Sequence, residues 1–153
     1  MTSMNADWRG VAVMNDDAAS PALDVAVLLE GLSAAQLLAV QEAAEKRLQS
    51  AALVAQSEDG LLDLLASRER TLCARQVFDA ALYVELSDRG AYRKGGFISM
   101  PALYSGGLRL GSGEARRRRV LATELGRFTT MTGERREPSL PATEAAVADG
   151  EIG

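Results

Sequence analysis

Histidine is absent from all 153 residues of the sequence. Without an imidazole the chain cannot form a Ser/His or Cys/His catalytic pair, and it has no histidine to bind a metal or to act as a base near neutral pH. Cysteine occurs once, as Cys73, which excludes an internal disulfide and a structural zinc site built from cysteines. We therefore expect no catalytic residue, no cofactor and no metal, and we predict that the chain is not an enzyme.

Carboxylates remain available for acid–base chemistry, and Glu42 and Glu45 lie three residues apart on a predicted helix. Lys46 follows Glu42 at the i,i+4 spacing of a surface ion pair. This pattern is typical of a solvated helix face, so we interpret both glutamates as surface residues.

Long hydrophobic runs are also lacking. The longest apolar window, residues 23–32, is interrupted by Asp24, Glu30 and Gly31, and it is well short of the roughly 20 residues that a membrane-spanning helix needs. The apolar stretch near the start, residues 11–14, is too short for the core of a secretory signal. We expect a cytoplasmic protein that does not bind membranes.

Aromatic residues make up only 5% of the sequence, whereas Ala and Leu are abundant, and no segment alternates with period two for long enough to predict a strand. The sequence therefore predicts an all-α fold. We expect a long antiparallel helical hairpin, then a short helix, an arginine-rich helix and a C-terminal helix. Residues 1–19 are polar and aperiodic and are predicted to form a disordered tail, and residues 20–153 are predicted to form one helical domain.

The first half of that domain carries two apolar stripes. A short helix that begins at Ser20 and Pro21 and ends at Gly31 should precede them. Ser33 and Gln36 form the S-x-x-Q pattern of a capping box, and the stripe that follows extends to about residue 56. After a break over residues 57–60, the second stripe comprises Leu62, Ala66, Glu69, Cys73, Val77, Ala80 and Val84.

The second stripe predicts a helix from about Leu61 to Ser87, ended by Gly90, with Cys73 as a small core residue. Two long helices joined by a short turn predict an antiparallel hairpin over residues 32–87. The hairpin is poor in large apolar residues. One hypothesis is therefore an interaction or oligomerisation module that binds a second copy or another helical protein.

The second half of the domain contains three further helical segments. A short helix is predicted from Met100 to about Ser105, and a glycine-rich turn over residues 106–113 leads into the arginine-rich helix. We expect Ser112 to cap that helix. The core-facing residues of the arginine-rich helix and the segment after it are predicted to be Ala115, Ala122, Leu125 and Phe128. Residues 132–140 should be a loop, and a last helix should begin near residue 141 and end at residue 150.

Charge is distributed unevenly along the chain. Residues 89–136 hold eleven basic and three acidic side chains, a net charge of +8, which leaves −12 for the rest of a chain whose total is −4. Guanidinium groups bind phosphates, so the basic segment predicts a contact with double-stranded DNA. The predicted contact residues are Arg109, Arg116, Arg117, Arg119 and Arg127. Four successive arginines fan out by about 100° each and cannot all face one groove, so some should lie over the core. The alternative is a basic face that binds the acidic hairpin or another protein.

Two stretches carry a family resemblance. LRLGSGEARRRR, from Leu108 to Arg119, and LPATEAAVADGEIG, from Leu140 to Gly153, resemble the helical region called domain of unknown function 222 in proteins of the 13E12 repeat family. The resemblance extends, more loosely, over residues 30–153. The sequence departs from the family pattern by placing Gly106 and Gly107 late in the short helix, which puts the regularity of that helix in question.

In the family that this chain resembles, the helical region continues and leads into a C-terminal HNH endonuclease segment, whose histidines bind a divalent metal and activate water. This chain has no histidine, so no catalytic residue is carried over. The resemblance implies a non-catalytic role beside DNA or in support of a nuclease, in a chain that is incomplete at its C-terminus. It also leaves open a truncated remnant with no independent function.

Overall fold

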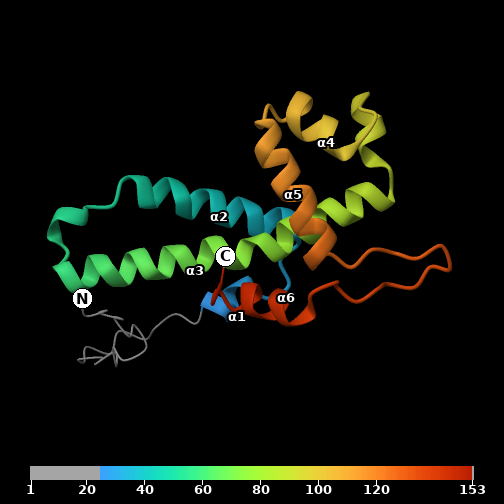
Figure 1. Cartoon of the computed structure of the whole chain (residues 1–153). Helices are drawn as coiled ribbons and strands as arrows, with labels where there is room; N and C mark the ends of the chain where they lie inside the picture. Colours follow the sequence, from blue (N-terminus) through green and yellow to red (C-terminus); the bar gives the residue numbers. More distant parts are fainter. Residues whose placement is uncertain (1–24, 153) are drawn as a thin grey trace, which may run out of the picture. The chain divides into compact units, whose positions relative to one another are not determined.

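The computed structural model describes residues 25–152 and is all-α, as the sequence predicts. Figure 1 shows the order of the helices along the chain. The chain divides into two compact units, one that ends at Ala52 and one that begins at Leu53, where the sequence indicated one helical domain over residues 20–153. The predicted tail over residues 1–19 and the predicted helix start at Ser20 and Pro21 lie outside the described residues.

The first unit contains α1 (Val25–Leu29) and α2 (Ala34–Gln49). Gly31 follows α1 with φ +76°, a conformation that favours glycine and suits the predicted helix end. The predicted capping box is confirmed, because Ser33 Oγ accepts a hydrogen bond from the Gln36 N–H and the Gln36 side chain accepts one from the Ser33 N–H.

The predicted end of α2 near residue 56 is wrong. The helix ends at Gln49 because Ser50 satisfies its last carbonyls: the Ser50 hydroxyl donates to the Arg47 carbonyl at 2.9 Å, and the Ser50 N–H bonds to the carbonyls of Arg47 and Leu48. A separate 3₁₀ turn, η2 (Leu53–Ala55), follows in the second unit. The apolar periodicity of the sequence continues to about residue 56 and so does not mark the end of the helix. The hydrogen bonds of Ser50 mark it.

The second unit is organised on α3 (Glu58–Asp88), which at 31 residues is about 46 Å long. The predicted break over residues 57–60 is the start of this helix, because Ser57 Oγ accepts the Gly60 N–H and Glu58 and Asp59 occupy the positive first turn. The predicted stop is confirmed: Gly90 adopts φ +61° just beyond the helix.

Short elements connect α3 to the arginine-rich helix. They are η3 (Ala91–Gly95), α4 (Met100–Ala102) and a π-helical turn, η4 (Leu103–Gly107). Ser99 caps α4 by accepting the Ala102 N–H. The π-helical turn ends with a bond from the Leu108 N–H to the Leu103 carbonyl at 3.0 Å, so the helix is irregular at the two late glycines.

The unit is completed by α5 (Ser112–Leu125) and α6 (Pro141–Ala148). The predicted cap at Ser112 is wrong, because Ser112 is already helical and Gly111 stands at the cap position without a side-chain bond. Between the two helices, residues 126–140 form an extended loop with a single antiparallel bridge from Thr129 to Arg135. The described residues contain no named strand.

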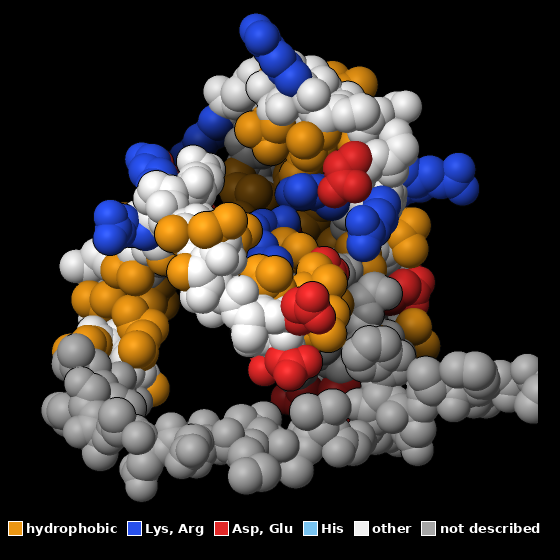
Figure 2. Space-filling model, turned by 90° about the vertical axis from the view of Figure 1, so that its left-hand side faces the viewer, with side chains coloured by type: hydrophobic (Ala, Val, Ile, Leu, Met, Phe, Trp, Pro, Cys, Tyr) orange, Lys and Arg blue, Asp and Glu red, His pale blue; other side chains and the backbone are white. Residues whose placement is uncertain are grey.

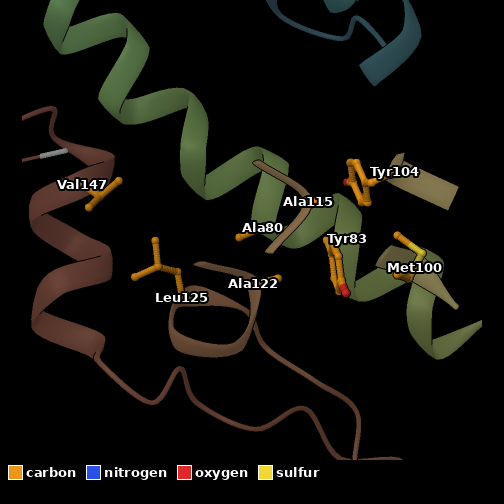
Figure 3. Close-up of a cluster of buried hydrophobic side chains, with 8 residues drawn as sticks. All are labelled: Ala80, Tyr83, Met100, Tyr104, Ala115, Ala122, Leu125 and Val147. Atoms are coloured by element: carbon orange, nitrogen blue, oxygen red, sulfur yellow. The ribbon is translucent and has the colours of Figure 1, made fainter. Parts of the chain in front are cut away.

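A small core joins α3, α4, η4, α5 and α6 (Figure 3). Alanines at its centre let α5 lie close to α3, and Ala122 is fully buried. The rings of Tyr83 and Tyr104 stack at the α4 end with centroids 5.6 Å apart. The buried members of the cluster are Ala80, Tyr83, Met100, Tyr104, Ala115, Ala122, Leu125 and Val147.

Residues predicted to lie in the core are buried near the C-terminal end of α3 and exposed near its N-terminal end. Ala80 and Val84 are buried, as are Ala115, Ala122 and Leu125 on α5, which confirms the predicted core face of that helix. Phe128 and Cys73 are half-buried, whereas Leu62 and Ala66 in the first half of α3 are exposed. The predicted stripe is therefore buried only toward the C-terminal end of α3, at Ala80 and Val84, and α5 and α6 are the helices that contact α3 most.

Candidate nucleic-acid interface

The arginine-rich helix α5 follows α4 and η4 through a short turn, residues 108–111. Backbone bonds hold this turn, because the Leu110 N–H donates to the Tyr104 carbonyl at 3.0 Å. Arg109 lies in the turn with φ +56°, the one positive φ of a non-glycine residue in the described part of the chain, and its side chain is exposed. Two packed helical segments joined by a turn thus present α5 at the surface of the second unit.

The buried side of α5 determines where its arginines point. Ala115, Ala122 and Leu125 face the core, and Arg116 and Arg119 are exposed on one flank of α5, about 100° around the helix from this buried side. We call this flank the outward face. Arg116 and Arg119 are neighbours at the i,i+3 spacing and are both exposed. Neither makes an ion pair or a side-chain hydrogen bond within residues 25–152.

Arg118 points the other way. Its Nε donates to Glu114 Oε1 at 2.8 Å, and its Cζ lies 5.6 Å from the centroid of the Tyr104 ring. The hydrogen bond from Arg118 lowers the pKa of the Glu114 carboxyl, and the same bond raises the pKa of the Arg118 guanidinium. Arg118 is the arginine that lies over the core, and the spacing of the buried residues on α5 was the signal that could have identified it.

A groove of about 290 Å³ lies beside Arg116 and Arg119, between α4 and η4 on one side and α5 on the other. Apart from the two arginines, the residues that line the groove have short side chains, and no acidic side chain is among them. The remaining lining residues are Pro101, Ala102, Ser105, Ser112 and Ala115.

A second cleft, of about 460 Å³, lies between α3 and the opposite flank of α5. Arg117 lines it together with Cys73, so Arg117 does not share the outward face of Arg116 and Arg119. This cleft carries charges of both signs. Its charged residues are Glu69, Arg75, Asp79, Glu114, Arg117 and Arg118.

Arg127 is held by carboxylates. Its guanidinium bonds to Glu137 at 2.6 Å and to Glu144 at 3.2 Å, which ties the end of α5 to the following loop and to α6. The hydrogen bond with Glu137 raises the pKa of Arg127. Arg127 is therefore not brought together with the arginines of the outward face.

Other basic residues of the +8 segment are also paired. Arg89 and Arg135 both bind Glu85. On the face drawn in Figure 2, basic and acidic side chains stand next to one another and do not form one block of a single sign. The positive surface without carboxylate partners is thus narrower than the sequence indicated. Among the predicted contact residues it comprises Arg109, Arg116, Arg117 and Arg119.

Sequence reasoning missed the residues that form the wall facing Arg116 and Arg119. Pro101, Ala102 and Ser105 carry no motif, and they become neighbours of α5 only through tertiary packing. Within residues 25–152 no group of three or more Cys, Asp and Glu residues is arranged to hold a metal ion. None of the described helices has the length and apolar character needed to cross a membrane.

Comparisons of the chain with protein-family models, with curated proteins and with solved structures each gave no match.

Proposed function

We propose that this chain is a non-catalytic helical module that contacts double-stranded DNA through α5, beside or in support of a nuclease. One observation carries the proposal: Arg116 and Arg119 project from the same outward face of α5, and no carboxylate within residues 25–152 binds either of them. Arginine side chains that no carboxylate neutralises are available to phosphate oxygens, which they bind through two parallel hydrogen bonds.

The contact that we propose is with the DNA backbone. Arg109, exposed in the turn before α5, and Arg117, exposed on the other flank of α5, would extend the contact to further phosphates. Arg127 would have to leave Glu137 and Glu144 first, so it contributes least of the predicted contact residues. Phosphate contacts position a protein on a duplex without reading its sequence. We therefore propose weak sequence preference and a strong dependence on salt.

Binding to a 20-base-pair duplex of mixed sequence, measured between 50 and 200 mM salt, tests the proposal. The wild-type chain should bind at low salt and weaken steeply as salt rises, because each neutralised phosphate releases a counterion. The double variant Arg116→Gln/Arg119→Gln should show a salt slope shallower by about 2. A wild-type chain that does not bind at 50 mM salt would contradict the proposal.

A second candidate function is self-association or binding of another helical protein. It is favoured by exposed leucines in each unit: Leu38 and Leu48 on α2, and Leu62 and Leu65 on α3, are each about half-exposed. Each helix thus presents apolar surface that a partner could cover. Sedimentation tests self-association, because a chain that remains a monomer at high concentration does not bind a second copy, and DNA binding by that monomer supports the first function.

A further inference from the structure

The groove beside Arg116 and Arg119 has a definite chemical character. Its lining is mostly apolar, with short side chains from Pro101, Ala102 and Ala115, and Arg116 and Arg119 also line it. Ser105 and Ser112 each contribute a hydroxyl group to the lining of the groove. The Ser105 hydroxyl donates to the Pro101 carbonyl at 2.9 Å, whereas the Ser112 hydroxyl makes no hydrogen bond in the described part of the chain.

We propose that this groove binds one sugar–phosphate unit of a DNA strand. The phosphate would lie between Arg116 and Arg119, with the Ser112 hydroxyl donating to one of its oxygens. The deoxyribose would pack on the wall formed by Pro101 and Ala102. The inference rests on the proposed function and adds to it the place on the molecule where the backbone binds.

Charge distinguishes this groove from the larger cleft on the other side of α5. That cleft holds the carboxyl groups of Glu69, Asp79 and Glu114, and the hydrogen bond from Arg118 lowers the pKa of Glu114 below its ordinary value. Such carboxylates repel a phosphate diester. The groove has no acidic lining residue and presents two arginines, so a polyanion is favoured there and disfavoured in the cleft.

The shape of the groove supports the same occupant. A phosphodiester chain alternates a charged phosphate with a largely apolar sugar, and the lining of the groove likewise combines two arginines with apolar residues. Pro101, Ala102 and Ser105 come from α4 and η4, and the two arginines come from α5, so a strand in the groove would contact both helical segments. Two contacts of this kind would fix the orientation of α5 on the duplex.

Filling the groove tests the inference. Ala102→Leu on one wall and Ser112→Leu on the other each add bulk without changing charge, and Ala145→Leu on the exposed surface of α6 is the matched control. We expect each groove variant to bind the 20-base-pair duplex roughly tenfold more weakly at 100 mM salt, with a slope shallower by about 1, and the control to bind like the wild type. Thermal melting of each variant verifies that the fold is retained.

A crosslinking measurement does not depend on filling the groove. In a Cys73→Ala background, the thiol of Ser105→Cys should attack a mixed disulfide tethered to one phosphate of the duplex, form a protein–DNA disulfide and release the small leaving thiol, and Ala145→Cys should not. Equal crosslinking at both positions, or groove variants that bind DNA like the wild type, would overturn the groove assignment and leave the proposed function standing. A wild-type chain that fails to bind the duplex at all would refute both.

Discussion

The guanidinium of Arg118 lies over the ring of Tyr104, with its Cζ 5.6 Å from the ring centroid. Tyr104 in turn stacks on Tyr83 from α3, so one arginine of the basic run is part of the packing between α3, η4 and α5. Arginines that are adjacent in the sequence therefore have different roles. Arg118 stabilises the fold, and Arg116 and Arg119 remain available at the surface.

Replacement of Arg118 should lower stability more than replacement of its neighbours. Arg118→Gln removes the ion pair with Glu114 and the contact with Tyr104, and we expect a loss of about 1 kcal/mol in the free energy of unfolding. Arg116→Gln is the matched control and should change stability by less than about 0.5 kcal/mol. Urea unfolding of both variants measures the difference, and equal stabilities would contradict the division of tasks.

The close approach of α5 to α3 should make Gly126 intolerant of a side chain. A Cβ at this position would clash with the carbonyl oxygen of Ala122 and with the Val84 side chain. Gly126→Ala should therefore destabilise the protein by about 2 kcal/mol. Gly113 on the same helix has open space around it, so Gly113→Ala should be neutral or stabilise by up to about 1 kcal/mol. Melting temperatures that do not separate the two variants would contradict the packing described.

Lowering the pH should remove the contribution that the Glu114 carboxylate makes to the free energy of unfolding. The folded protein lowers the pKa of Glu114, so its contribution is fully present above the pKa of the unfolded chain and is lost as pH falls through the folded value. Glu114→Gln should accordingly lose less stability than the wild type between pH 7 and pH 3. Unfolding curves across that range measure this, with Glu42→Gln, which removes an exposed pair with Lys46, as the control. Parallel pH profiles for wild type and Glu114→Gln would count against it.

Arg127 should act on the fold and have little effect on DNA. Arg127→Gln breaks the link from α5 to Glu137 and Glu144, so we expect faster hydrogen exchange of the α6 amides. Its effect on duplex binding should be smaller than that of Arg116→Gln. If the two variants weaken binding equally, Arg127 belongs to the contact surface, as the sequence alone predicts.

Local signals in the sequence predicted the local structure. The capping box at Ser33 and Gln36, the helix stop at Gly90 and the start of α6 at Pro141 each depend on a few adjacent residues, and all are confirmed. The end of α2 was wrong because the bonds of Ser50 to the preceding carbonyls compete with a periodicity that continues beyond it.

Tertiary packing determined what the sequence could not. The apolar stripe of α3 predicted burial along its whole length, yet Leu62 is exposed, and the buried stripe residues, Ala80 and Val84, lie toward the C-terminal end of the helix. The distribution of charge along the sequence predicted the basic segment, but it could not show that Glu137 and Glu144 bind Arg127. The groove between α4 and α5 was missed for the same reason, since its walls meet only in the folded chain.

The proposed DNA contact requires arginines that no carboxylate binds, and two double variants of equal charge test this requirement most directly. Arg116→Gln/Arg119→Gln removes the outward pair, and Arg89→Gln/Arg135→Gln removes two exposed arginines that both bind Glu85. The measurement is the salt dependence of affinity for one duplex. We predict that the first variant binds the duplex more weakly and has a salt slope shallower by about 2, whereas the affinity and the slope of the second stay close to those of the wild type. Equal losses in both variants would mean that DNA responds only to net charge, and they would contradict the assignment of the contact to α5.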